Sequence, residues 1–125
     1  MEKVTGIGGF FFPSKDPEAL ARWYRDALGI DLVPPDYDTR PWQQEAGTTV
    51  FAPFTIVRDP ATDRPHPFML NFRVRDLDAM IRQIEATGSV ITRGPEDHPN
   101  GLFAWTNDPD GNPIELWEPH ETYKE

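Results

Sequence analysis

The first part of the chain combines short apolar runs with one amphipathic stripe. Ile7–Phe12 is apolar, glycine-led and aromatic, which predicts a buried strand. Asp16 then stands at a helix N-cap position, Pro17 at the first helical position and Gly29 where the helix should end. Apolar residues between them recur on one helical face, so we expect an amphipathic helix. Further strands are expected at Ile30–Val33, Trp42–Gln44 and Thr48–Val57.

The second part of the chain repeats this plan. Phe68–Val74 alternates between apolar and polar residues, Asp76 is again an N-cap, and Gly88 again stops a helical stripe. The caps Asp16 and Asp76 lie 60 residues apart. Three more strands are expected at Ser89–Thr92, Phe103–Thr106 and Ile114–Glu118, the last two joined by turn-forming residues 108–112.

Two copies of a β-α-β-β-β unit therefore fill the chain: a first module over about residues 4–60 and a second over about 66–120. A unit of about 60 residues is only marginally stable by itself. The two modules should therefore form a single domain.

Composition narrows the classes of function. The 125 residues include no Cys, which excludes disulfides, thiolate metal sites and a cysteine nucleophile. A formal net charge of -9 argues against a nucleic-acid partner, because such binding needs Lys and Arg at phosphates. We find neither a membrane-spanning run nor a secretion signal, so a soluble cytoplasmic protein is expected. The fourteen prolines concentrate between the periodic blocks and predict loops.

Three stretches carry a resemblance to a known family. They are Asp-Pro-Glu-Ala-Leu-Ala-Arg-Trp-Tyr-Arg-Asp-Ala-Leu-Gly at 16–29, Asn-Phe-Arg-Val-Arg-Asp-Leu-Asp-Ala at 71–79, and Asp-Pro-Asp-Gly-Asn-Pro-Ile-Glu-Leu-Trp-Glu at 108–118. In this order they resemble the vicinal oxygen chelate superfamily, which includes glyoxalases, bleomycin resistance proteins and extradiol dioxygenases. The resemblance implies an α+β fold in which two βαβββ modules form an open, cupped, eight-stranded mixed sheet. It also implies a homodimer, as do the exposed edge strands of two open modules.

The same resemblance implies where a divalent metal would bind. The ligand on the first strand of each module would fall on Gly9 and Met69, which cannot hold a hard cation. The ligand at the end of the second module falls on Glu115, and its first-module counterpart, between Thr49 and Thr55, is missing. We therefore expect no metal cofactor. The alternative is a rearranged set in which Glu115 joins residues such as His66, His98, Glu45 or His120.

Strand alternation predicts the lining of the cup. If Gly9 and Met69 face inward, so do Ile7, Phe11, Asn71 and Arg73. On the last strand Glu115 and Trp117 face inward, while Ile114 and Leu116 join the core. The residues expected to contact a small organic ligand are Phe11, Trp42, Gln44, Met69, Asn71, Arg73, Trp105 and Trp117. Trp42 has an alternative role, as a plug at the end of the sheet.

The two candidate catalytic residues are Glu115 and His98. A carboxylate among apolar groups can act as a general base, whereas the structural alternative pairs Glu115 with Arg73 or another cation. His98 lies in a loop expected to overhang the cup, and imidazole titrates near physiological pH. The sequence leaves three hypotheses open: a protein that binds a small molecule without metal, an active lyase, isomerase or dioxygenase that uses Glu115, and a purely structural or regulatory module.

Overall fold

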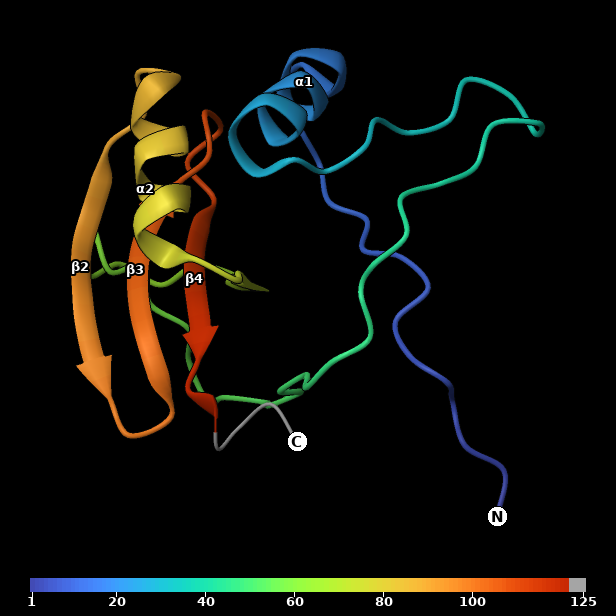
Figure 1. Cartoon of the computed structure of the whole chain (residues 1–125). Coiled ribbons are helices and arrows are strands. Elements are labelled where there is room, and N and C mark those ends of the chain that lie inside the picture. Colours follow the sequence, from blue (N-terminus) through green and yellow to red (C-terminus); the bar gives the residue numbers. More distant parts are fainter. Residues whose placement is uncertain (122–125) are drawn as a thin grey trace.

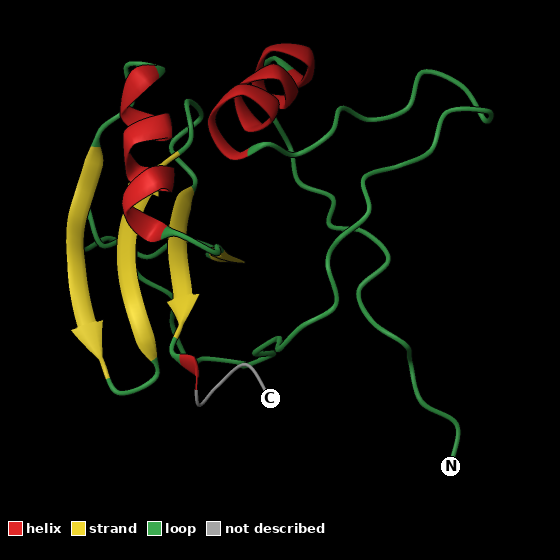
Figure 2. Ribbon diagram, in the orientation of Figure 1, coloured by secondary structure: helices red, strands yellow, loops and turns green. Residues whose placement is uncertain are grey.

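The computed structural model describes residues 1–121 and contains two helices and four strands. In chain order the elements are α1 (Pro17–Leu28), β1 (Leu70–Arg73), α2 (Leu77–Ala86), β2 (Ile91–His98), β3 (Gly101–Asn107) and β4 (Pro113–Pro119). All four strands belong to the second module, and α2 lies across one face of their sheet (Figures 1 and 2).

Both helices begin and end as the sequence predicts. The side chain of Asp16 accepts a hydrogen bond from the backbone N–H of Ala19 and caps α1, and Gly29 closes this helix with a left-handed φ of 73°. Asp76 caps α2 in the same way, by accepting from the N–H of Ala79. The C-cap residue of α2 is Thr87, and Gly88 follows it with a φ of 87°.

The strands form one mixed sheet with the order β1-β4-β3-β2. Strand β1 runs parallel to β4, with Asn71 opposite Glu115. The other two pairs are antiparallel, and Trp105 lies opposite Glu115 across β3 and β4. Glu115 therefore sits in the strand between Asn71 and Trp105.

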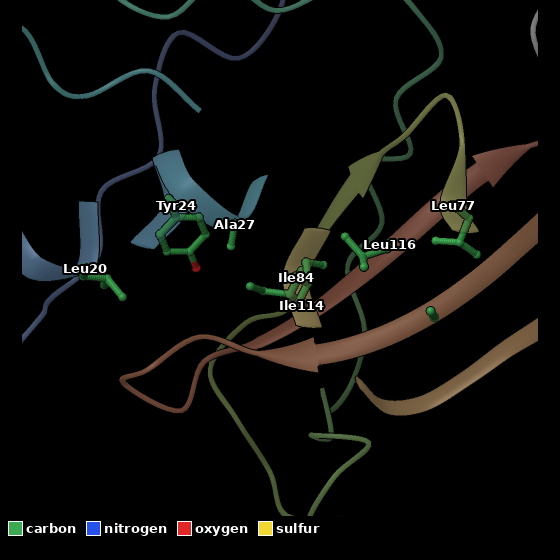
Figure 3. Close-up of a cluster of buried hydrophobic side chains, with 8 residues drawn as sticks. Leu20, Tyr24, Ala27, Leu77, Ile84, Ile114 and Leu116 are labelled. Atoms are coloured by element: carbon green, nitrogen blue, oxygen red, sulfur yellow. The ribbon is translucent and has the colours of Figure 1, made fainter. Parts of the chain in front are cut away.

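The core lies between the helices and one face of this sheet. Ile114 and Leu116 of β4 are fully buried, as alternation predicted, and Leu77 and Ile84 of α2 pack on them. Helix α1 contributes its own apolar stripe, Leu20, Tyr24 and Ala27, to the same cluster (Figure 3). Burial of each Leu or Ile side chain in this cluster stabilises the fold by about 1.5–3 kcal/mol.

The first module differs from the prediction. The expected strands at Ile7–Phe12, Ile30–Val33, Trp42–Gln44 and Thr48–Val57 are not strands: within residues 1–69, ladder pairing between backbones is limited to an isolated bridge that joins Arg58 and Pro65. These segments are coil or bends, and in Figure 1 the dark blue and blue-green chain lies to one side of the sheet, before the green chain returns to it. A strand needs a neighbouring strand for its backbone hydrogen bonds, and the single chain does not bring one to these segments.

Two smaller predictions for the second module also need correction. The strand expected at Ser89–Thr92 is longer and shifted, because β2 continues through the cis peptide bond Gly94–Pro95 to His98. His98 is therefore the last residue of a strand and does not lie in a loop. The first strand of this module is shorter than expected, Leu70–Arg73. The closing strands and their connecting turn agree with the prediction.

A buried polar network joins α1 to the turn between β3 and β4. The hydroxyl of Tyr24 donates to Oδ2 of Asp108 at 2.7 Å, and Asp108 is only 4% exposed. Burial first, and then this hydrogen bond, raise the pKa of Tyr24 far above its ordinary value of 10.0. The folded protein therefore keeps this phenol protonated in alkali.

We expect this network to make stability fall at alkaline pH. Because the folded pKa is raised, the contribution of Tyr24 is complete below pH 10 and is lost as pH rises further, when the unfolded chain ionises. Tyr24→Phe should cost about 1–2 kcal/mol at pH 7. Its deficit relative to the wild type should shrink above pH 10, as urea unfolding at a series of pH values would measure.

The exposed Tyr37 provides the control for this experiment. Tyr37→Phe should leave unfolding unchanged at every pH. A Tyr24→Phe deficit that stays constant between pH 7 and 11 would contradict the role given to the buried phenol.

In the described part of the chain, no helix is long and apolar enough to cross a membrane.

Candidate functional site

Three aromatic rings form a stack on the face of the sheet opposite the helices. Phe103 of β3 stacks on Trp105 with ring centroids 6.0 Å apart and planes 17° apart, and on Trp117 of β4 at 6.2 Å and 13°. These residues alternate with core residues such as Ala104 and Leu116, so the side chain period of two places them together. We call Phe103, Trp105 and Trp117 the aromatic wall.

Glu115 lies beside the aromatic wall and is held by two neutral donors. The amide of Asn71 donates to its Oε1 at 2.6 Å, and the indole N–H of Trp105 donates to its Oε2 at 2.9 Å. The alternative of a pair with Arg73 is not what the structure has, because Arg73 instead donates to the backbone oxygen of Glu45 at 3.2 Å. The two bonds fix the orientation of the carboxylate, and in the described part of the chain it has no cationic partner.

An open pocket of about 330 Å³ brings Glu115 and His98 together. Its lining consists of His98, Pro99, Asn100, Phe103, Trp105 and Glu115. This is within the size range of small-molecule sites, and its mixture of aromatic rings with a few polar groups is typical of them. A larger hollow of about 490 Å³ lies at the start of α1, away from the aromatic wall. We choose the smaller pocket as the candidate ligand site because its polar groups converge beside stacked rings.

Charged residues of β2 border this pocket. The Arg93 guanidinium lies 5.0 Å from the Trp105 ring centroid, and its Nε donates to Glu96 at 2.6 Å. His98 lies 3.0 Å from the other oxygen of Glu96. These hydrogen bonds, that from Arg93 first, lower the pKa of Glu96. The side chain of His98 is thus already oriented by a carboxylate at the edge of the pocket.

Four of the predicted ligand contacts, Phe11, Trp42, Gln44 and Met69, do not line this pocket. Phe11 is 95% exposed in the extended first module, and Trp42 and Gln44 are also exposed there. Met69 is half-buried just before β1. Trp117 forms the back of the aromatic wall: it is buried, and its indole N–H donates to the backbone oxygen of Asn100 at 2.9 Å.

Sequence reasoning missed Phe103 and Arg93 as site residues. Phe103 could have been found, because it shares the strand alternation of Trp105. Arg93 could not, because the prediction ended the strand of β2 at Thr92 and left this residue in a loop. Only the continued strand, antiparallel to β3 with Arg93 opposite Trp105, puts the guanidinium over the indole.

The side chains around Glu115 do not form a binding site for a divalent metal. The neighbours of Glu115 are an amide N–H and an indole N–H, which cannot ligate a cation, and residues 1–121 contain no cluster of three His, Asp or Glu able to hold an ion. The alternative ligands each have another partner: His66 contacts Asn112, His98 contacts Glu96, His120 contacts Asp97 and Glu45 contacts Arg75. We therefore derive no chemistry through a metal at this site.

Comparison with known proteins identifies the family. The glyoxalase-like domain family matches residues 9–117, and the chain therefore belongs to this family. This confirms the resemblance to the vicinal oxygen chelate superfamily. A search of curated proteins found no match.

Solved structures give more specific likenesses. The chain is similar to TnmS3, an antibiotic binding protein from Streptomyces sp. CB03234, with 26% identity, a TM-score of 0.67, and 96% of this chain and 100% of that chain covered. It is also similar to a glyoxalase/bleomycin resistance protein from the same source, with 26% identity, a TM-score of 0.53, and 85% and 94% covered. TioX from Micromonospora sp. ML1 shares the fold at 15% identity and a TM-score of 0.55, with 86% and 93% covered.

Proposed function

We propose that this protein binds a small, flat organic molecule in the pocket beside Glu115 and uses no divalent metal to do so. The observation that carries the proposal is the aromatic wall standing next to a carboxylate with which no cation among residues 1–121 pairs. The likeness to TnmS3, an antibiotic binding protein, supports the binding of a small molecule.

The chemistry of the pocket favours a flat ligand that carries a positive charge or strong hydrogen-bond donors. A planar ring can lie against Phe103, since offset stacking adds about 0.5–1.5 kcal/mol beyond the area buried. Glu115 offers its remaining lone pairs to a donor on that ligand. The chain's net charge of -9 also attracts cations before they bind.

Binding explains the site better than turnover by a lyase, isomerase or dioxygenase. The amide of Asn71 and the indole of Trp105 each donate one hydrogen bond to Glu115, which holds the carboxylate in one orientation and leaves a lone pair on each oxygen for a ligand. These bonds suit a carboxylate that orients a ligand. His98 serves as a second polar contact at the edge of the pocket.

Two further features belong to this proposal. The protein works as a cytoplasmic homodimer, and its two modules together form the eight-stranded cup that the family fold implies. The free edge strand β1 and the extended first module support an assembly that is larger than one chain.

Calorimetric titration with doxorubicin, a flat cationic antibiotic, and with bleomycin tests the function. We expect saturable binding of doxorubicin and a loss of tenfold or more in affinity in Glu115→Gln, because a hydrogen bond to a charged group contributes about 1.5–3 kcal/mol. The flat anion 1-anilinonaphthalene-8-sulfonate should lose no affinity in this variant.

Glu85→Gln is the matched control, because it removes the same charge from an exposed position of α2. It should bind doxorubicin as the wild type does. The proposed function is wrong if the wild type binds neither antibiotic saturably, or if the two Gln variants weaken binding equally. A stoichiometric divalent metal that is present in the purified protein and lost in Glu115→Ala would overturn the proposal that the site uses no metal.

A further inference from the structure

A planar cation of this chain already occupies the face of Trp105. The Cζ atom of Arg93 lies 5.0 Å from the centroid of the Trp105 ring, within the range in which a guanidinium and an indole attract each other. Nε of the same guanidinium donates to Oε2 of Glu96 at 2.6 Å, and Nη2 lies 3.5 Å from Oε1. This cation is therefore held by an aromatic ring and a carboxylate at once.

A register shift in β2 brings these two charged side chains to one face of the sheet. Side chains of a regular strand alternate, so residues three apart point to opposite faces. The pairing of β2 with β3 shifts between Arg93, which lies opposite Trp105, and Glu96, which lies opposite Phe103. Gly94 lies within this shift, and an added Cβ there would crowd the backbone oxygen of Phe103. The backbone of β2 thus places Arg93 and Glu96 together beside the aromatic wall.

The ring is far less exposed than the side chain that covers it. Trp105 is only 8% exposed although it lines the pocket, whereas the side chain of Arg93 is 55% exposed. Ion pairs of such exposed side chains contribute little to stability, because water and salt screen them. A ligand can therefore displace Arg93 at little cost, and the displaced guanidinium can remain hydrated.

The charges beside Trp105 favour a cation in this position. Glu96 pairs with Arg93, and Glu115 accepts the indole N–H of Trp105 itself at 2.9 Å. His98 contacts Oε1 of Glu96 at 3.0 Å, whereas Oε2 is bonded to Arg93. If Arg93 moves away, two carboxylates flank the aromatic wall, and their negative potential attracts a replacement cation.

We propose that Arg93 stands in for the cationic group of the ligand, so that a planar amidinium or guanidinium group on a flat ligand displaces it, stacks on Trp105 and binds Glu96. A planar cation presents parallel N–H groups that match a carboxylate, whereas an ammonium is a compact point charge. This subsite therefore selects delocalised cations over ammonium groups. The inference rests on the proposed function, because it names the class of ligand for the same pocket.

Titration with benzamidine, a flat amidinium, tests the subsite directly. The chemical shift of the Trp105 indole N–H, followed by NMR, reports binding at this ring. We expect Arg93→Ala to bind benzamidine roughly tenfold more tightly than the wild type does, because the chain's own cation no longer competes for the ring and for Glu96. Benzylamine, which carries an ammonium group beside the same kind of ring, should gain no more than about threefold.

Three further variants complete the test. Adding Glu96→Gln to Arg93→Ala should abolish the gain for benzamidine, because Glu96 is the carboxylate that receives the amidinium. Arg93→Gln keeps part of the aliphatic stem and should show a gain in the same direction as Arg93→Ala. Arg25→Ala is the matched control, since Arg25 pairs with the exposed Asp26 on α1, and it should bind benzamidine as the wild type does.

Equal affinities of Arg93→Ala and the wild type for benzamidine would overturn the inference, as would a gain that survives Glu96→Gln or that benzylamine matches. The proposed function fails separately. If the wild type does not bind doxorubicin but Arg93→Ala binds benzamidine through Glu96, the subsite stands and the proposed function is wrong. If doxorubicin binds and the gain for benzamidine is absent, the pocket remains and Arg93 does not stand in for a ligand.

Discussion

Gly101→Ala should destabilise the protein by about 3 kcal/mol or more, because strain and overpacking each cost about 1–3 kcal/mol. Gly101 pairs with His98 at the turn between β2 and β3, with φ 148°, a backbone conformation that L side chains rarely adopt. An added Cβ would also run into the backbone oxygen of Glu118 and the indole of Trp117. Neither the carbonyl nor the buried ring can move without disturbing β4.

The measurement is chemical unfolding, with Gly88→Ala as the matched control. Gly88 has φ 87°, and its Cβ would meet no atom within 4 Å, so this variant carries the backbone strain alone. We expect it to cost about 1–2 kcal/mol. Equal losses in the two variants would show that crowding against β4 contributes nothing. Gly101→Ala should also weaken ligand binding, since Trp117 supports the aromatic wall.

Asp108→Ala should cost about 3–5 kcal/mol, because it breaks a buried network and leaves its donors unpaired. Oδ1 of Asp108 accepts the backbone N–H groups of Asp110 and Asn112, both at 2.9 Å. Oδ2 accepts the Tyr24 hydroxyl at 2.7 Å and the Asn112 amide at 2.8 Å. The single carboxylate thus fixes the turn between β3 and β4 and fastens it to α1.

Asp110→Ala is the control in the same turn, because its side chain is exposed. It should change the free energy of unfolding by no more than about 0.5 kcal/mol. Urea unfolding of both variants at pH 7 makes the comparison. An Asp108→Ala loss as small as that of Asp110→Ala would mean that the network does not stabilise the fold.

Both helices and the second module could be predicted closely because their signals are local. A capping Asp, a helical stripe and a stopping Gly act within a few residues of one another, so α1 and α2 follow from the sequence directly. Alternation likewise assigned Ile114 and Leu116 to the core. It also set Asn71 and Glu115 on one face, where the structure joins them.

The partners of these local elements were harder to predict. Arg93 lies over Trp105 because β2 continues past a proline that suggested a loop, and propensity cannot anticipate a strand held by its neighbour. The sequence left open an ion pair between Glu115 and a cation. In the structure Glu115 instead accepts hydrogen bonds from the amide of Asn71 and the indole of Trp105. Such choices depend on which side chains meet across strands far apart in the sequence.

The sequence by itself determined the helix caps, the faces of β1 and β4 and the family, because these depend on the order of residue types along the chain. Only the tertiary structure decided that Glu115 is held between Asn71 and Trp105 and that the first module remains extended within one chain. A strand pattern specifies that a segment will pair but does not name its partner. Which strand edge it pairs with depends on the strands that the tertiary structure places beside it.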